Sequence, residues 1–269
     1  MSPALRSARH YRPPPPPLLT HCALFLDIDG TLAELVDDPR SVRVDAKVAV
    51  ALPRLAQSLD GALALITGRA VSDADRLFPR LKLPIAGQHG CERRGADGVI
   101  HLYTPHPATL DRLRELARGL AARHPGLLVE DKGATLGLHY RHSPHLALQL
   151  RRALRSSLDD AGDTDGYTLQ RGKMMLEVRP ENRDKGTAIR DFMAEKPFAG
   201  RLPVFVGDDR TDEHGFAAVE ALGGWSIKVG PGATHAHFRL ADIAAVRRWL
   251  LALPDNASST GHANAQRAS

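Results

Sequence analysis

The stretch Ala23-Leu-Phe-Leu-Asp-Ile-Asp-Gly-Thr31 decides the fold of this chain and points to its chemistry. Its first four residues are apolar, as in a strand that is buried on both faces of a parallel sheet. Asp27 and Asp29 follow where this strand ends. Because side chains alternate along a strand, two residues at this spacing point the same way and can converge on one ligand. Gly30 permits a tight turn directly after the strand.

Apolar strands alternate with amphipathic helices on both sides of this stretch. This order predicts an α/β fold with a Rossmann-like parallel sheet covered by helices. The predicted strands are 23–28, 62–66, 83–86, 204–206 and 226–229, and the predicted helices are 45–59, 71–78, 185–194, 212–221 and 243–253.

The middle of the chain has a different order of elements. A strand, two helices and two hairpins, the latter around Lys132-Gly133 and Gly172-Lys173, predict an inserted α+β domain. We expect the two chain ends of this insert to lie close together. The predicted organisation is a disordered Pro-rich tail at 1–20, a core domain at 21–98 and 179–254, an inserted α+β domain at 99–178, and a disordered tail at 255–269.

The amino-acid composition excludes several classes of protein. The 269 residues are 43% hydrophobic and 25% charged, which is ordinary for a globular chain and excludes fibrous and fully disordered proteins. A net charge of +5 raises nucleic-acid binding as an alternative. The arginines are scattered among acidic residues, however, and only 5% of the residues are aromatic, so we expect no nucleic-acid partner.

The cysteines and the hydropathy give further expectations. Two cysteines without a Cys-x-x-Cys pair suit a reducing compartment, so we expect a cytoplasmic protein. No run of about 18 apolar residues is present, so we expect no membrane association. We also expect a monomer.

A second acidic segment follows another predicted strand. Gly207-Asp208-Asp209 comes after 204–206, so Asp208 can share a Mg²⁺ site with the first aspartates, because hard divalent cations prefer oxygen ligands. Asp212 and Glu213 begin the next predicted helix, where carboxylates suit capping and the helix dipole.

Two further segments suit a phosphate. Thr67-Gly68-Arg69 follows the strand 62–66 and offers a hydroxyl and main-chain amides. Lys185 opens a predicted helix and can neutralise a phosphoryl group.

These four segments, in this order, resemble the motifs of the haloacid dehalogenase-like superfamily of phosphohydrolases. The resemblance implies that Asp27 is the nucleophile and that Asp29 protonates the leaving group and later activates water. It also implies that Thr67 and Lys185 hold the phosphate, and that the insert at 99–178 is a cap domain of C2 type. Mg²⁺ would be held by Asp27, the main-chain carbonyl of Asp29, and Asp208.

The insert and its borders resemble the trehalose-6-phosphate phosphatase family. The segments that carry this resemblance are Gly87-Gln-His-Gly90, Glu130-Asp-Lys-Gly133, His139-Tyr-Arg141 and Gly172-Lys-Met-Met-Leu-Glu-Val-Arg-Pro180.

The resemblance implies roles for residues of the insert. Glu130, Lys132 and Glu177 would bind sugar hydroxyls, and Arg141 and Lys173 would lie near the phosphate or the second glucose. His139 alternates with leucines, and we expect it to be a core histidine rather than a ligand.

The reaction implied is the Mg²⁺-dependent hydrolysis of trehalose 6-phosphate to trehalose and phosphate through an aspartyl-phosphate. One alternative is the same reaction on another sugar phosphate, such as sucrose 6-phosphate or a glucosylglycerate phosphate. An alternative of another class is a non-catalytic protein that binds a sugar phosphate. Either way, the expected partner is a small-molecule sugar phosphate.

Overall fold

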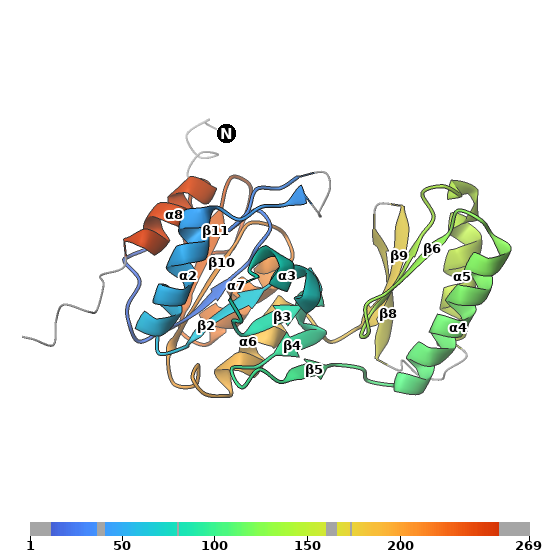
Figure 1. The fold of residues 1–269 in the computed structure, drawn as a ribbon, viewed down its shortest axis with the longest axis horizontal. Coiled ribbons are helices and arrows are strands. Elements are labelled where there is room, and N and C mark those ends of the chain that lie inside the picture. Colours follow the sequence, from blue (N-terminus) through green and yellow to red (C-terminus); the bar gives the residue numbers. More distant parts are fainter. Residues whose placement is uncertain (1–11, 37–40, 80, 160–165, 173, 253–269) are drawn as a thin grey trace, which may run out of the picture. The chain divides into compact units, whose positions relative to one another are not determined.

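The computed structural model of the chain describes residues 12–36, 41–79, 81–159, 166–172 and 174–252 (Figure 1). The chain forms two compact units, which we describe one at a time. The first unit comprises Met1–Leu65, Leu77–Leu83 and Ile189–Ser269, and the second comprises Ile66–Arg76 and Pro84–Ala188. In the described part of the chain, every helix is too short or too polar to cross a lipid bilayer.

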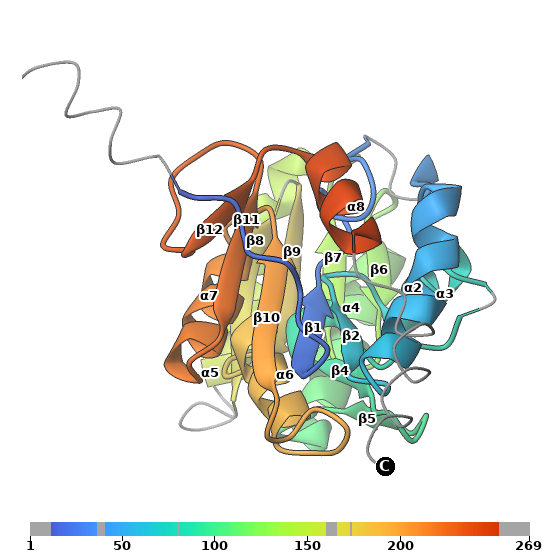
Figure 2. The same cartoon turned by 90° about the vertical axis from the view of Figure 1, so that its left-hand side faces the viewer.

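The first unit is built on parallel strands that lie side by side in the order β12-β11-β10-β1-β2 (Figure 2). Every residue of β1 is buried, which agrees with its uninterrupted apolar sequence. The strand bounds are β1 (Cys22–Leu26), β2 (Leu63–Ile66), β10 (Leu202–Gly207), β11 (Trp225–Val229) and β12 (Phe238–Leu240).

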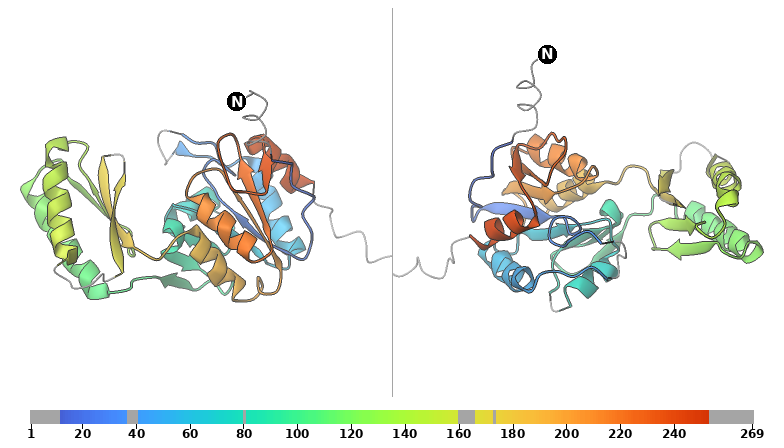
Figure 3. Two further views of the ribbon diagram at one scale, coloured as in Figure 1. Left: turned by 180° about the vertical axis from the view of Figure 1, so that it is seen from behind. Right: turned by 90° about the horizontal axis from the view of Figure 1, so that it is seen from above.

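Helices cover both faces of this parallel sheet. The chain leaves β1 through α2 to reach β2 on one side, and it leaves β10 through α7 to reach β11 on the other side. Because such connections are right-handed, α2 and α7 lie on opposite faces. Helix α8 packs beside α2 (Figure 3). The helix bounds in this unit are α2 (Ala46–Ser58), α7 (Asp212–Ala221) and α8 (Ile243–Leu251), and α6 (Lys185–Met193) begins in the second unit and ends in the first.

The described part of the N-terminal segment is bonded to the first unit. The main-chain carbonyl of Pro13 accepts a hydrogen bond from the Arg239 amide at 2.9 Å, and that of Pro16 accepts one from Trp249 Nε1 at 2.9 Å. Leu18 is buried. Residues 12–18 are therefore held in place, in contrast to the disorder predicted for 1–20. Residues 1–11 and the predicted tail 255–269 lie outside the described residues.

The second unit contains an antiparallel sheet in the order β6-β7-β9-β8, with two long helices on one face (Figures 1 and 3). The two hairpins agree with the turns predicted around Lys132-Gly133 and Gly172-Lys173. The bounds are α4 (Pro107–Arg123), β6 (Leu128–Asp131), β7 (Leu136–His139), α5 (Ala147–Asp159), β8 (Tyr167–Gly172) and β9 (Met175–Pro180).

The second unit also holds short elements on either side of residue 99. They are α3 (Val71–Leu77), β3 (Ile85–Gly87), the 3₁₀ turn η2 (Gln88–Gly90), β4 (Glu92–Arg94), β5 (Ile100–Leu102) and the 3₁₀ turn η3 (Pro144–Leu146). Strands β3, β4 and β5 pair antiparallel in that order. Tyr103, near the start of the predicted insert, contacts Arg183, just after its end, because the guanidinium of Arg183 lies 4.7 Å from the ring centroid of Tyr103. The whole of 99–178 belongs to this unit, and its boundaries as a domain stay a prediction.

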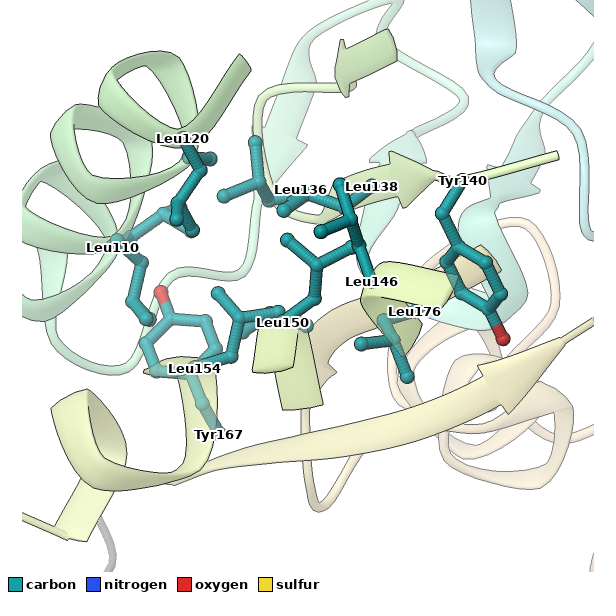
Figure 4. Close-up of a cluster of buried hydrophobic side chains, with 13 residues drawn as sticks. Leu110, Leu120, Leu136, Leu138, Tyr140, Leu146, Leu150, Leu154, Tyr167 and Leu176 are labelled. Atoms are coloured by element: carbon teal, nitrogen blue, oxygen red, sulfur yellow. The ribbon is translucent and has the colours of Figure 1, made fainter. Parts of the chain in front are cut away.

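A leucine-rich core joins the sheet of the second unit to its helices (Figure 4). Alternation along β7 and β9 sends Leu136, Leu138, Leu176 and Val178 toward α4 and α5, and it leaves the residues between them on the opposite face. The helices contribute Leu110, Leu113, Ala117, Leu120, Leu150 and Leu154.

Helix α5 offers a test of this core. Leu150 is fully buried, whereas Leu148 on the same helix is 56% exposed. We expect Leu150→Ala to lower the free energy of unfolding by about 2–5 kcal/mol, because it leaves a cavity. Leu148→Ala should change it by less than about 0.5 kcal/mol. Urea unfolding followed by circular dichroism measures both, and equal losses in the two variants would contradict the packing described.

Candidate active site

The paired strands β1 and β10 bring acidic side chains together. Leu26 pairs with Val206, and the Asp27 amide donates to the Val206 carbonyl at 3.0 Å. The two strands therefore end at the same edge of the sheet, and the residues that follow them meet there. Asp27, Asp208 and Asp212 each offer a carboxylate oxygen, and these oxygens lie within 4.8 Å of one another. Asp27 and Asp212 are buried, and Asp208 is half-buried.

The main chain around this cluster leaves no room for larger residues. Gly30 has a φ of +83°, and a Cβ there would lie 2.1 Å from Asp208 Oδ2. Glycine is thus required both by the backbone conformation and by the approach of the carboxylate. On the other side, Asp212 Oδ2 accepts hydrogen bonds from the amides of Asp208 and Asp209, each at 2.9 Å. These two bonds fix the loop that carries Asp208.

The donor set of the cluster fits a hard divalent cation. Three carboxylates this close repel one another, and burial strengthens the repulsion because water is excluded. A cation with oxygen ligands removes the repulsion, and Mg²⁺ prefers such ligands. Thr31 Oγ1 is buried beside this turn and has no hydrogen-bond partner among the described residues. Thr31 Oγ1 is therefore available to form a hydrogen bond with a ligand or a water molecule.

A buried lysine holds the main chain of the loop that follows β10. Lys228 Nζ on β11 donates to the main-chain carbonyls of Asp208 and Val229, each at 2.5 Å. Burial lowers the pKa of Lys228, whereas the charge of Asp208 acts in the opposite direction. Lys228 thus fixes the backbone of the loop that follows β10.

Asp212 is a residue whose place the sequence pattern did not reveal. We expected it to cap α7 and to orient the loop, and its carboxylate does bind two loop amides. It also lies with Asp27 and Asp208 in the cluster. The available signal was its place at the start of the helix that follows the Asp208 loop, close in sequence to a predicted metal ligand. Asp29 is half-buried, and its predicted main-chain bond to a metal stays a prediction.

The predicted phosphate residues lie in the second unit. Thr67 is fully buried, and its Oγ1 accepts a hydrogen bond from the Arg69 amide at 3.2 Å. Gly68 is exposed, and a Cβ there would lie 2.7 Å from the Nε2 of His89. The approach of Thr67, Gly68 and Arg69 to Asp27 stays a prediction.

Lys185 is buried at the first turn of α6. The helix begins there because Asp184 and Thr187 cap it reciprocally. The Thr187 amide donates to Asp184 Oδ1 at 2.7 Å, and the Asp184 amide donates to Thr187 Oγ1 at 2.9 Å. This capping fixes the start of the helix and the direction of the Lys185 main chain. Its predicted role toward phosphate stays a prediction.

The open face of the β6-β7-β9 sheet carries the predicted sugar-binding residues. Glu130 pairs with Gly137, and Gly137 pairs with Glu177, so the two glutamates lie on the same face across a residue without a side chain. Lys132 Nζ lies 3.6 Å from Glu130 Oε2 and 3.8 Å from Glu177 Oε1. The structure therefore brings Glu130, Lys132 and Glu177 into one polar cluster.

His139 belongs to this open face, and the expectation of a core histidine is wrong. Leu136 and Leu138 point into the core, so alternation places His139 on the other face. Its side chain is 33% exposed, and its Nε2 lies 2.9 Å from Glu130 Oε2. Of the other predicted residues, Arg141 is exposed beyond β7, and Lys173 lies outside the described residues.

Comparison with known proteins identifies the family. The model of the trehalose-phosphatase family matches residues 25–244. The chain belongs to the trehalose-phosphatase family. Among its relatives, it is 44% identical to the probable trehalose-phosphate phosphatase of Sinorhizobium fredii over 213 residues, which are 79% of each chain. It is 42% identical to the trehalose-6-phosphate phosphatase of Escherichia coli over 236 residues, which are 87% of each chain.

A solved structure supports the same family assignment. The crystal structure of a trehalose-6-phosphate phosphatase related protein aligns with a TM-score of 0.63 and 29% identity, over 85% of this chain and 95% of that one. The predicted α/β class is confirmed. The carboxylate cluster and the polar face of the β6-β7-β9 sheet both lie within the residues matched to the trehalose-phosphatase family.

The carboxylate cluster can be tested by metal binding alone. We expect Asp208→Asn and Asp212→Asn each to weaken Mg²⁺ binding by about ten-fold or more, because each removes one charge from the donor set. Calorimetric titration of Mg²⁺ into metal-free protein measures the affinity. Asp242→Asn is the matched control, because Asp242 only caps α8, and asparagine caps equally well. Unchanged affinity in both cluster variants would exclude the cluster as the metal site.

Proposed function

We propose that this chain is a Mg²⁺-dependent phosphatase that hydrolyses trehalose 6-phosphate to trehalose and phosphate. The observation that carries the proposal is the family match over residues 25–244, together with the 42% identity to the Escherichia coli enzyme over 87% of each chain. Two features of the structure support it: a buried carboxylate cluster suited to phosphoryl transfer and a polar sheet face suited to a sugar.

Asp27 is the proposed nucleophile. One of its carboxylate oxygens attacks phosphorus, so that an O–P bond forms as the bond from phosphorus to the sugar oxygen breaks. A carboxylate and a phosphate dianion repel each other, and Lys185 is proposed to offset part of this charge. When bound, Mg²⁺ supplies the remaining positive charge and polarises the phosphoryl group. Burial of Asp27 to 3% exposure keeps competing water from its carboxylate.

Asp29 is the proposed acid and base. It donates a proton to the departing sugar oxygen, and its carboxylate then takes a proton from the water that attacks the aspartyl-phosphate. It follows Asp27 by two positions and is half-buried, which leaves it open to the leaving group. Thr67, Gly68 and Arg69 are proposed to hold the non-bridging phosphate oxygens, and Thr67 Oγ1 can donate its proton to one of them because it already accepts from the Arg69 amide.

Glu130, Lys132 and Glu177 are the proposed sugar-binding residues. Carboxylate oxygens accept and the ammonium donates, so the three together match hydroxyl groups, which do both. Their mutual ion pairs, at 3.6 and 3.8 Å, keep the cluster ordered. Arg141 and Lys173 are proposed to lie near the phosphate or the second glucose.

The proposal includes a cytoplasmic monomer whose partner is a small-molecule sugar phosphate and not a nucleic acid or a membrane. Cys22 and Cys91 are both free and buried, which suits a reducing compartment. Burial raises the pKa of the Cys91 thiol to about 11, so this thiol stays protonated and unreactive at neutral pH.

The role of Asp27 gives a direct prediction. Asp27→Asn should lower turnover of trehalose 6-phosphate by at least about a thousand-fold, because the amide is not a nucleophile toward phosphorus. The fold should be unchanged, as judged by circular dichroism and thermal unfolding. Asp97→Asn, in an exposed turn, is the control and should keep full activity. Near wild-type turnover in freshly purified, non-deamidated Asp27→Asn would exclude the covalent step.

The substrate is tested by phosphate release with Mg²⁺ over several sugar phosphates. We expect trehalose 6-phosphate to have the highest kcat/KM, ahead of sucrose 6-phosphate, glucosylglycerate phosphate and glucose 6-phosphate. A higher value for one of the others would change the substrate but keep the reaction. No release from any of them would favour a non-catalytic sugar-phosphate-binding protein.

A further inference from the structure

Gln88 lies between two functional segments of the second unit. It follows β3 in the turn η2, and its side-chain amide reaches the hairpin that joins β6 to β7. Its Nε2 donates to the main-chain carbonyl of Lys132 at 2.8 Å, and its Oε1 accepts from Thr135 Oγ1 at 2.7 Å. Gln88 and Thr135 are buried to 4% and 2% exposure, so these bonds are shielded from water.

The amide orientation of Gln88 follows from its partners. Besides the Lys132 carbonyl, Nε2 donates to Glu92 Oε2 at 3.2 Å, so both partners of the nitrogen can only accept. The opposite orientation would place the amide oxygen against two acceptors. Both N–H groups are therefore used, and the side chain has one favourable position.

The backbone of Gln88 is tied to the predicted phosphate loop. The Gln88 amide donates to the Arg69 carbonyl at 2.8 Å, and the His89 amide donates to the Thr67 carbonyl at 3.0 Å. Glu92 Oε2, which accepts from Gln88, also accepts from the Val71 amide at 2.8 Å. One residue thus bonds through its main chain to the Thr67–Arg69 loop and through its side chain to the hairpin that carries Lys132.

The hairpin is fixed from its other side by helix α4. Arg114 bonds to Asp131 at 2.9 and 3.2 Å and to the Gly133 carbonyl at 2.5 Å. Gln88 holds the opposite side of the same turn, between the main chain of Lys132 and the side chain of Thr135. The side chain of Lys132 is then left to the cluster with Glu130 and Glu177.

The backbone of Gln88 is in an uncommon conformation for glutamine. Its φ is +50°, in the left-handed region, where a side chain is sterically strained. Glycine would adopt this conformation without that cost, so the side-chain bonds offset the strain.

We infer that Gln88 is a positioning and specificity-determining residue, which sets the distance between the phosphate-holding loop and the sugar-binding hairpin through its bonds to Lys132 and Thr135. This inference rests on the proposed function. It assigns Gln88 no contact with the reacting atoms.

Two substitutions separate the side-chain bonds from the backbone conformation. Gln88→Gly favours the left-handed conformation and removes the amide, and Gln88→Asn keeps an amide that is one methylene too short to reach. In both, kcat/KM for trehalose 6-phosphate should fall about ten-fold, mainly through a higher KM, because two hydrogen bonds to the hairpin are lost. For p-nitrophenyl phosphate, which has no sugar to bind, kcat/KM should stay within about two-fold.

Two further variants sharpen the test. Thr135→Val removes one of the same bonds, so the double variant Gln88→Gly/Thr135→Val should lose less than the product of the single losses. Gln149→Ala, at an exposed glutamine of α5, is the matched control and should change neither substrate. Equal losses for both substrates would assign Gln88 a merely structural role, and unchanged kinetics in both variants would overturn the inference.

Amide hydrogen exchange tests whether Gln88 anchors the hairpin, independently of the proposed substrate. In Gln88→Gly and Gln88→Asn, the amides of 128–139 should exchange at least about five-fold faster than in the wild type, with other regions unchanged. If the wild type fails to hydrolyse trehalose 6-phosphate, the proposed function fails, while faster exchange would still support Gln88 as the anchor of the hairpin. Unchanged exchange would overturn that role whatever the substrate.

Discussion

The repulsion between three neighbouring carboxylates is the constraint on which this structure depends. The register of β1 against β10 forces Asp27 and Asp208 to the same sheet edge, and α7 adds Asp212. A divalent cation bound by these oxygens would remove the repulsion. The surrounding chain serves to hold it: Gly30 admits the Asp208 carboxylate, and Lys228 fixes the loop from behind.

In the second unit, the alternation of side chains along the strands places apolar residues on one face of the sheet and polar residues on the other. One face of the β6-β7-β9 sheet gives leucines to the helices, and the other face gathers acids, a lysine and a histidine. Gly137 lies between Glu130 and Glu177 in the register, and a Cβ there would lie 3.6 Å from Glu130 Oε2 and 3.5 Å from Met175 Cε. The leucine core packs this sheet against two helices, so its polar residues stand on a rigid support, as their proposed role in sugar binding requires.

Local pattern predicted the elements that have strong hydrophobic periodicity. The buried strand before Asp27 and the two hairpins of the middle segment are examples. The pattern missed β4 and β12, because their sequences, Glu-Arg-Arg and Phe-Arg-Leu, contain charged residues and no apolar run, so they form only against neighbouring strands. It also misjudged the stretch 12–18, because proline-rich sequence indicates disorder until specific partners such as Trp249 are present.

The sequence by itself determined the class of fold through its alternating strands and helices, and the resemblance of its motifs around Asp27, Asp29 and Asp208 to a known family indicated the chemistry. Only the tertiary structure decided which other residues join them. Asp212 enters the carboxylate cluster through the turn of a helix, His139 reaches Glu130 through the pleat of a strand, and Gln88 reaches the hairpin through a left-handed turn. These contacts depend on side-chain direction in three dimensions, which residue spacing along the chain does not specify.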